Sequence, residues 1–172
     1  MMAPRTESEQ ERRRRIAILN DRLPKKRTIA QGLLRNPAGE VLLCELTYKP
    51  EWDLPGGVVD PGESPATCVE REVQEELGIT VVAGRLLAVN WLPPWRGWDD
   101  AHLFLFDLGV HDTGELDPAR FLRREIAGAH WLTVAEAAAH VAPYTARMLD
   151  LAADAGHTAY LENSEPRGGT GA

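Results

Sequence analysis

Three glutamates in one short segment have a spacing that suits the binding of a metal ion. Glu72, Glu75 and Glu76 stand at positions i, i+3 and i+4, so a helix would carry their carboxylates on one face. Negative charges so close together repel one another unless a cation binds between them. Hard divalent ions such as Mg²⁺ and Mn²⁺ take oxygen ligands. For three glutamates alone, however, a solvated acidic face is the more common arrangement.

The residues around these glutamates favour metal binding over a solvated face. Arg71 comes one residue before Glu72 and four before Glu75, so its guanidinium can pair with a carboxylate and fix its orientation. Glu63 precedes the predicted helix, near the positive end of the helix dipole. Gly57 lies in a Pro-Gly-Gly turn, where the bare backbone can approach an ion or a ligand. An acidic site of this kind can bind a phosphate only through such a cation.

Start and stop signals define the helix that carries the glutamates. Ser64 suits the N-cap, Pro65 suits the first helical position, and Gly78 suits the left-handed residue that ends a helix. A stripe of apolar residues recurs within it at helical spacing and should face the core. The members of this stripe are Ala66, Val69, Val73 and Leu77.

The spacing of these residues as a whole resembles the Nudix box. Gly57 is followed after five residues by Glu63 and, after seven more, by the run Arg71-Glu72-Val73-Gln74-Glu75-Glu76-Leu77-Gly78-Ile79. Every defining position of the box is matched, and Val73 and Ile79 occupy its two aliphatic positions. Seven fixed identities coincide by chance on the order of 10⁻⁸ per position tried. The preceding residues, 52–57, resemble the usual lead-in of the family.

The resemblance implies an α/β fold: a Nudix-type α/β/α sandwich with a mixed sheet, as a single domain over residues 28–153. Residues 1–27 would form a basic, partly helical N-terminal extension, and residues 154–172 a C-terminal tail. Within the box, Glu63 and Gly78 would support the loop and the helix.

By the same resemblance, Glu72, Glu75 and Glu76 should bind the divalent metal, which is Mg²⁺ or Mn²⁺. The backbone carbonyl of Gly57 would help them. Arg71 would join these glutamates in the catalytic machinery by supporting the loop and the helix rather than by touching phosphorus.

Many Nudix proteins also supply a carboxylate from a later loop, either as a further metal ligand or as the general base. Glu125 is the candidate here, because it lies six residues before Trp131 in the next predicted strand. Glu115 and Asp117 are rivals in the same connection. An exposed loop charge without a catalytic role is the alternative for Glu125.

The reaction implied by the resemblance is hydrolysis of a phosphoanhydride bond in a nucleoside diphosphate that is linked to another moiety. The substrate would be a nucleotide sugar, ADP-ribose or an NTP-like molecule. The metal would acidify a water molecule, a carboxylate would accept its proton, and Lys49 would offset charge on the leaving phosphate. The alternatives are a nucleotide-sensing binding module, an enzyme of isoprenoid diphosphate chemistry, and an RNA-end pyrophosphohydrolase.

A loop rich in tryptophan is the candidate for binding the nucleotide. Trp95, Arg96 and Trp98 follow a predicted strand, and exposed aromatic and guanidinium groups can stack on a nucleobase. Trp91 instead suits the core. Packing of the loop tryptophans at the domain's own edge or at a dimer contact is the alternative.

Apolar runs and turn signals predict the remaining elements. Strands are expected over residues 29–34, 41–46, 52–54, 79–82, 85–92, 102–108 and 128–132. Helices are expected over residues 11–21, 133–140 and 144–153. Residues 1–10 and 167–172 are expected to be without fixed structure.

Composition narrows the class of protein further. The chain has 172 residues, 44% of them hydrophobic, which suits one globular domain. It has no apolar run near the roughly 18 residues of a membrane span and no signal-peptide pattern. Its two cysteines, Cys44 and Cys68, lack metal-ligand spacing and are expected to be buried free thiols in the reducing cytoplasm.

Charge is distributed unevenly along the chain and bears on its partners. Residues 1–27 contain nine Lys and Arg against four Asp and Glu, a balance of +5, so the net charge of −7 leaves −12 for the remainder. The negative charge of residues 28–172 disfavours a nucleic-acid partner. The expected partners are therefore a small-molecule nucleotide substrate and, as in many Nudix proteins, a second copy of the chain in a homodimer.

Overall fold

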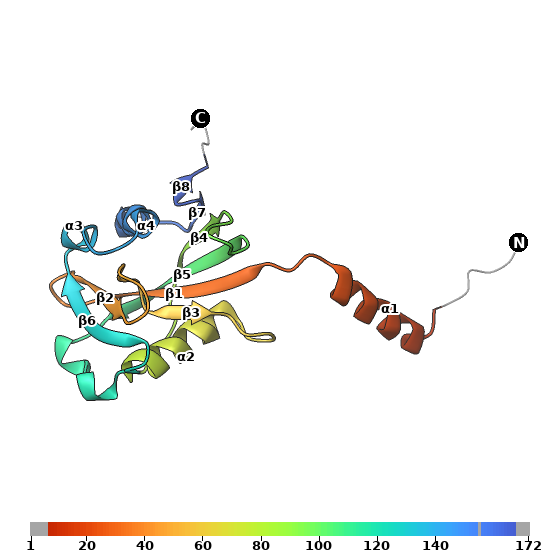
Figure 1. Cartoon of the computed structure of the whole chain (residues 1–172), viewed down its shortest axis with the longest axis horizontal. Helices are drawn as coiled ribbons and strands as arrows, with labels where there is room; N and C mark the ends of the chain where they lie inside the picture. Colours follow the sequence, from red (N-terminus) through yellow and green to blue (C-terminus); the bar gives the residue numbers. More distant parts are fainter. Residues whose placement is uncertain (1–6, 155, 168–172) are drawn as a thin grey trace, which may run out of the picture.

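A mixed β-sheet lies at the centre of the computed structural model, which describes residues 7–154 and 156–167 (Figure 1). Helix α2 (Pro65–Leu77) covers one face of the sheet, and helices α3 (Val134–Ala137) and α4 (Pro143–Asp154) lie on the other. The predicted α/β/α sandwich is therefore confirmed. In the described part of the chain, no helix is both long enough and apolar enough to span a membrane.

The sheet combines antiparallel hairpins with two parallel pairs. Seven of the eight strands in the described residues follow the order β6-β2-β1-β5-β4-β7-β8, while β3 pairs with β1. The pairs β1–β5 and β4–β7 are parallel. The strands are β1 (Arg27–Arg35), β2 (Val41–Leu46), β3 (Gly56–Val58), β4 (Leu86–Leu92), β5 (Ala101–Val110), β6 (Ile126–Leu132), β7 (Ala159–Glu162) and β8 (Glu165–Pro166).

Each face of the sheet has its own hydrophobic core, because side chains alternate between the faces along each strand. The core against α3 and α4 includes Leu33 and Leu43, whereas the core against α2 includes Leu34 and Leu42. The predicted apolar stripe of α2 is confirmed at three of its four positions, which are fully buried, while Ala66 is partly exposed. The buried members are Val69, Val73 and Leu77.

Helix α2 begins and ends at the residues that its sequence signals predict. The Ser64 hydroxyl accepts a hydrogen bond from the Thr67 backbone N–H at 3.2 Å, and Pro65 is the first helical residue. Gly78 has a φ of 70° and donates its N–H to the Gln74 carbonyl at 3.0 Å. These caps satisfy backbone groups at both ends of the helix, so the register of the glutamates is well defined.

Helix α1 (Glu9–Arg22) extends away from the sheet on the N-terminal side (Figure 1). It contains no buried residue. Its N-terminus is closed by a capping box, in which Ser8 and Glu11 bond to each other's backbone N–H. The helix predicted over residues 11–21 is thus confirmed with an earlier start. Of residues 1–10, predicted to lack fixed structure, 9 and 10 are helical and 1–6 lie outside the described residues.

Two predicted strands are absent, at residues 52–54 and at residues 79–82. Around residues 52–54 only isolated bridges form, from Trp52 to Val141 and from Asp53 to Cys44; the neighbouring strand is β3 instead. Residues 79–82 form no strand. Immediately after them the Ala83 N–H bonds to the Glu70 carboxylate at 2.8 Å. Side-chain acceptors of this kind are not visible in a hydropathy pattern.

The C-terminal stretch contains two strands that the sequence pattern did not predict. β7 pairs in parallel with β4, and β8 pairs with β7. The sheet therefore continues beyond residue 153, into the stretch assigned to a tail. Residues 168–172 of the predicted flexible tail lie outside the described residues. Helix α3 is shorter than the predicted 133–140, because the chain turns into α4 soon after Ala137.

Candidate active site

Glu76 is a buried carboxylate of α2 that faces the start of β3. Its side chain is 6% exposed, and its Oε2 accepts a hydrogen bond from the Gly56 backbone N–H at 3.0 Å. Burial raises the pKa of Glu76 to about 8, and the nearby charges of Glu72, Glu125 and Asp53 act in the same direction. A buried carboxylate among other carboxylates is unfavourable unless a cation joins them.

Glu72 lies one turn earlier on α2 and packs directly against the backbone of Gly57. A Cβ atom added to Gly57 would lie 2.5 Å from Oε1 of Glu72, so the carboxylate would have to leave its present position. Burial is the main cause of a raised pKa at Glu72, and the charges of Glu75 and Glu125 add to it. The glycine is therefore required here so that the helix carboxylate can approach the turn.

Arg71 connects the loop before α2 to two of the helix glutamates. Its Nε and one terminal nitrogen donate to the two oxygens of Glu63 at 2.8 and 3.0 Å. Its other terminal nitrogen donates to Glu72 at 2.9 Å and to Glu75 at 3.3 Å. This pairing lowers the pKa of Glu63 to about 2 and raises that of Arg71. Arg71 thus orients carboxylates, as a planar guanidinium is suited to do.

Glu125 is the later carboxylate whose charge acts on the helix glutamates. It raises the pKa of both Glu72 and Glu76, and its backbone carbonyl accepts from the Thr47 N–H at 2.9 Å. All three candidate carboxylates have partners, and Oε1 of Glu125 accepts from Nε of Arg124 at 2.9 Å. Glu115 bonds to His111 at 3.0 Å, and Asp117 caps a 3₁₀ turn through the Ala119 N–H at 2.9 Å.

Lys49 is paired with a buried aspartate that the sequence analysis did not select. Its Nζ lies 2.7 Å from Oδ2 of Asp53, whose Oδ1 accepts from the Gln31 side-chain amide at 2.9 Å. Burial alone would lower the pKa of Lys49, but Asp53 raises it. Asp53 lies in the lead-in to the box, one residue after Trp52. This position is the sequence signal from which Asp53 could have been selected. Lys49 therefore forms an ion pair with Asp53 in this structure.

Trp52 fixes the lead-in segment by stacking between two histidines. Its ring centroid lies 4.2 Å from that of His130 and 4.1 Å from that of His140, with nearly parallel planes. The Trp52 backbone N–H also donates to the His140 carbonyl at 2.9 Å. Since Asp53 and Gly57 follow along the same segment, this stack positions the turn on which Glu72 and Glu76 pack.

The remaining predicted residues are placed away from this cluster. Trp95, Arg96 and Trp98 form the tip of the β4–β5 hairpin, near the start of β1. Gly78 supports the end of α2, where a Cβ atom would lie 2.7 Å from Cβ of Arg120. The predicted box residues therefore lie together around α2 and β3, whereas the predicted substrate-binding set divides between Lys49 and the hairpin.

Both cysteines are buried free thiols, as predicted. Burial raises the pKa of Cys44 well above its ordinary value and raises that of Cys68 to about 12. Thiols held in this protonated form are poor nucleophiles, so neither cysteine is suited to covalent catalysis.

The residues of the cluster fit a hard divalent cation, although they do not surround one point in this conformation. Among the described residues, no three His, Cys, Asp or Glu side chains are grouped closely enough to hold one ion, and Arg71 occupies oxygens of Glu72 and Glu75. The buried, destabilised Glu76 and the bare backbone of Gly57 nevertheless match an oxygen-donor site.

The fold and the arrangement of these residues are those of a Nudix domain. The family model described as NUDIX domain matches residues 25–152, and the chain belongs to the Nudix hydrolase family. Among solved structures, the MutT protein from Methanosarcina mazei Go1 is similar, with a TM-score of 0.63 and 26% identity, over 76% of this chain and 96% of that chain.

Curated relatives with different names match the chain over part of their length. The putative 8-oxo-dGTP diphosphatase of Bacillus subtilis is 38% identical over 72 residues, which are 42% of this chain and 47% of that protein. The nucleoside triphosphatase NudI of Escherichia fergusonii is 32% identical over 93 residues, which are 51% of this chain and 61% of that protein. The chain spans about half the length of these relatives.

Proposed function

We propose that the protein hydrolyses a phosphoanhydride bond in a nucleoside diphosphate linked to another moiety, with Mg²⁺ or Mn²⁺ as cofactor. The moiety would be a sugar, a ribose or a further phosphate, so that nucleotide sugars, ADP-ribose and nucleoside triphosphates are the substrate class. The printed names of the relatives, a diphosphatase and a triphosphatase, support this class.

The observation that carries the proposal is the buried carboxylate of Glu76, bonded to the Gly56 N–H, one helical turn from the carboxylate of Glu72, which lies against the bare backbone of Gly57. Two carboxylates held in this way are energetically unfavourable unless a cation binds between them. We assign the metal ligands to Glu72, Glu75, Glu76 and the Gly57 carbonyl. When bound, the ion would neutralise phosphate charge and acidify a water molecule.

Arg71 and Glu63 have a positioning role in this proposal. Their two-oxygen pairing fixes the guanidinium, which in turn orients Glu72. Glu125 is assigned as the general base or a further ligand, because its charge acts on both buried glutamates and it lies at the end of β2, where the Thr47 N–H bonds its carbonyl. A carboxylate so placed can accept the proton of the attacking water.

The test is a substrate panel combined with a matched pair of variants. Nucleoside triphosphates, ADP-ribose, nucleotide sugars, dinucleoside polyphosphates and capped RNA are assayed with Mg²⁺ and with Mn²⁺. We expect turnover of at least one of them, abolished by EDTA and restored by metal. Glu76→Gln should lower kcat by several orders of magnitude, whereas Glu9→Gln on α1 should leave it unchanged. Near-normal turnover by Glu76→Gln would refute the metal assignment.

The panel also separates the alternatives. Nucleotide binding without turnover of any substrate would identify a sensing module instead of an enzyme. Release of nucleotide from capped RNA alone would identify an RNA-end pyrophosphohydrolase. The catalytic domain over residues 28–153, the cytoplasmic location and the homodimer stay predictions; the buried free thiols of Cys44 and Cys68 support a reducing compartment.

A further inference from the structure

The tip of the β4–β5 hairpin is a tight turn that presents two tryptophans. The backbone N–H and carbonyl of Trp95 and Trp98 bond to each other at 3.0 and 2.9 Å. Between them, Arg96 and Gly97 have φ angles of 47° and 87°, which is the backbone of a two-residue turn with both central residues left-handed. The turn therefore holds both indoles in fixed positions on one short loop.

Both indole rings are exposed, and each has a guanidinium over it. Trp95 is 67% exposed and Trp98 is 63% exposed. The Arg27 guanidinium carbon lies 4.6 Å from the ring centroid of Trp98, and that of Arg96 lies 5.3 Å from the ring centroid of Trp95. Large aromatic surfaces exposed in pairs are uncommon on a folded domain and mark binding sites. Cation–π contacts of this kind also hold the rings in place.

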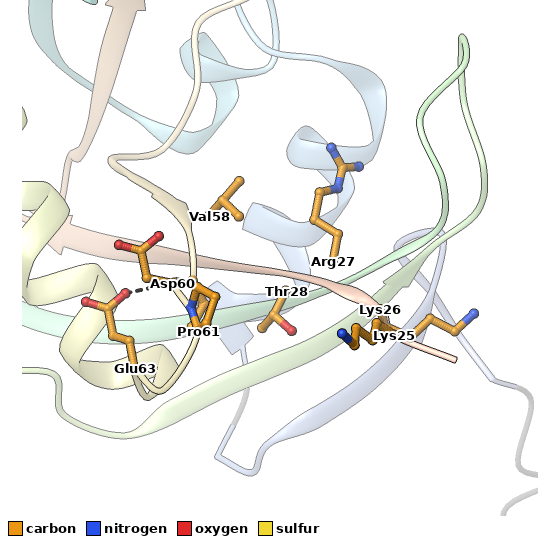
Figure 2. A pocket seen from close by; sticks show the side chains of 9 residues that line it. Lys25, Lys26, Arg27, Thr28, Val58, Asp60, Pro61 and Glu63 are labelled. Carbon is orange, nitrogen blue, oxygen red and sulfur yellow. Dashed lines mark hydrogen bonds between the residues drawn. The ribbon is translucent and has the colours of Figure 1, made fainter. Parts of the chain in front are cut away.

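Arg27 connects this tip to a hollow of about 540 Å³ beside the loop of the box. Figure 2 shows Lys25, Lys26 and Arg27 on one side of the hollow and Asp60 and Glu63 on the other. The Nε–H of Arg27 is buried and has no acceptor in the part of the chain that the structure describes. Another nitrogen of the same guanidinium donates to the Asp99 carbonyl at 3.5 Å, which ties Arg27 to the start of β5.

The hollow follows β1 and the residues after Gly57. Gly57 pairs with Ala30 on β1, and Arg27 stands three residues earlier on the same strand, a separation of about 10 Å at the rise of a β-strand. Val58 and Val59, which line the hollow, follow Gly57 directly. The hollow therefore begins next to Gly57 and reaches Arg27, whose guanidinium lies over Trp98.

We propose that the hairpin tip and Arg27 bind the nucleoside part of the substrate, with its base stacked on the exposed indoles. Arg27 covers one face of Trp98 and leaves the opposite face for the base, and the cationic side of the hollow lies along the sugar and the adjoining phosphate. This inference rests on the proposed function. Since every base has a stacking face, such a site accepts several bases, and the reacting anhydride would be selected at the carboxylates.

The test compares two monophosphates that have no anhydride bond and differ by the base: AMP and ribose 5-phosphate. Their affinities for the full-length protein with Mn²⁺ are measured by isothermal titration calorimetry. AMP should bind at least about tenfold more tightly, as expected for one stacked base. The double variant Trp95→Ala/Trp98→Ala should lose this advantage, whereas Tyr160→Ala, which removes an exposed ring on β7, should retain it.

A second pair of variants tests Arg27. Arg27→Gln should weaken AMP binding severalfold, while Arg123→Gln, whose guanidinium lies over Phe121 elsewhere, should not. Equal affinity for AMP and ribose 5-phosphate in the unaltered protein, or an AMP advantage that survives the double tryptophan change, overturns the inference. The measurement needs no turnover, so a failure of the proposed hydrolysis is recognised separately, in the substrate panel.

Discussion

Helices α1 and α2 are built from similar local signals but differ in what they contribute. α1 has 14 residues and α2 has 13, and each has a serine at its N-cap. α1 buries no residue, whereas α2 buries five. Hydrogen bonds from Ser8 lower the pKa of Glu11 on α1, while burial raises that of Glu76 on α2 to about 8. Local signals of this kind form a helix, but only packing against the sheet buries a glutamate and raises its pKa.

The largest expected difference between the two helices is in stability. Leu77→Ala removes a fully buried side chain from α2 and should lower the free energy of unfolding by about 2–5 kcal/mol. Leu19→Ala on the exposed α1 should change it by less than about 0.5 kcal/mol. Urea denaturation followed by circular dichroism measures both. Equal losses of unfolding free energy in the two variants would contradict this, because they would show that Leu19 is buried in solution.

The contact between α2 and β3 is tested by adding one methyl group to Gly57. Gly57→Ala places a carbon 2.5 Å from the Glu72 carboxylate, so Glu72 must move away from its position. We expect kcat and Mn²⁺ affinity to fall by about 10- to 100-fold, as for other changes that displace a ligand. Gly114→Ala, where a Cβ meets nothing within 4 Å, is the control. Unchanged Mn²⁺ affinity in Gly57→Ala would argue against Glu72 as a ligand.

The raised pKa of Glu76 predicts a pH dependence of metal binding. Because this pKa is about 8 in the metal-free protein, the carboxyl carries a proton below that pH, and an ion must displace it. Mn²⁺ affinity should therefore fall, by up to about tenfold per pH unit, as the pH drops below about 8. Calorimetric titrations from about pH 6 to about pH 9 measure this, because that range includes pH values below and above the pKa. In Glu76→Gln the remaining affinity should vary less with pH; an equal slope would assign the proton to another group.

The smallest effect is expected from removing α1. Deletion of residues 1–22 should change kcat/KM for small nucleotides by less than about twofold and leave stability within about 0.5 kcal/mol, because α1 buries no side chain. Steady-state kinetics and urea denaturation check both. Loss of activity on capped RNA alone, with nucleotide turnover retained, would instead show that the basic helix serves an RNA substrate.

Prediction from sequence worked best where the signal is local. The caps Ser64 and Gly78 and the stripe of Val69, Val73 and Leu77 place α2 correctly. Prediction from local signals failed where contacts with other segments decide whether a strand forms. Residues 79–82 are not a strand, and the Ala83 N–H beyond them bonds to the Glu70 carboxylate. β7 exists because β4 offers it an edge, which no pattern within residues 159–162 reveals.

The same distinction applies to the candidate site. The box residues could be selected from spacing alone, but Lys49 was grouped with the substrate-binding residues although it is paired with Asp53. Arg27 was not selected, since its contact with Trp98 joins residues far apart along the chain. The choice of Glu125 over Glu115 and Asp117 likewise gained support only from the charges it brings close to Glu72 and Glu76.

The sequence by itself determined the helix, the positions of its glutamates and the family of the protein, because caps and i, i+3, i+4 spacing act within a few residues. Only the tertiary structure decided which glutamate is buried, which lysine is already paired and which arginine lies over a tryptophan. The physical reason is that desolvation and ion pairing depend on distances in space, and segments far apart in the chain set those distances when the sheet assembles.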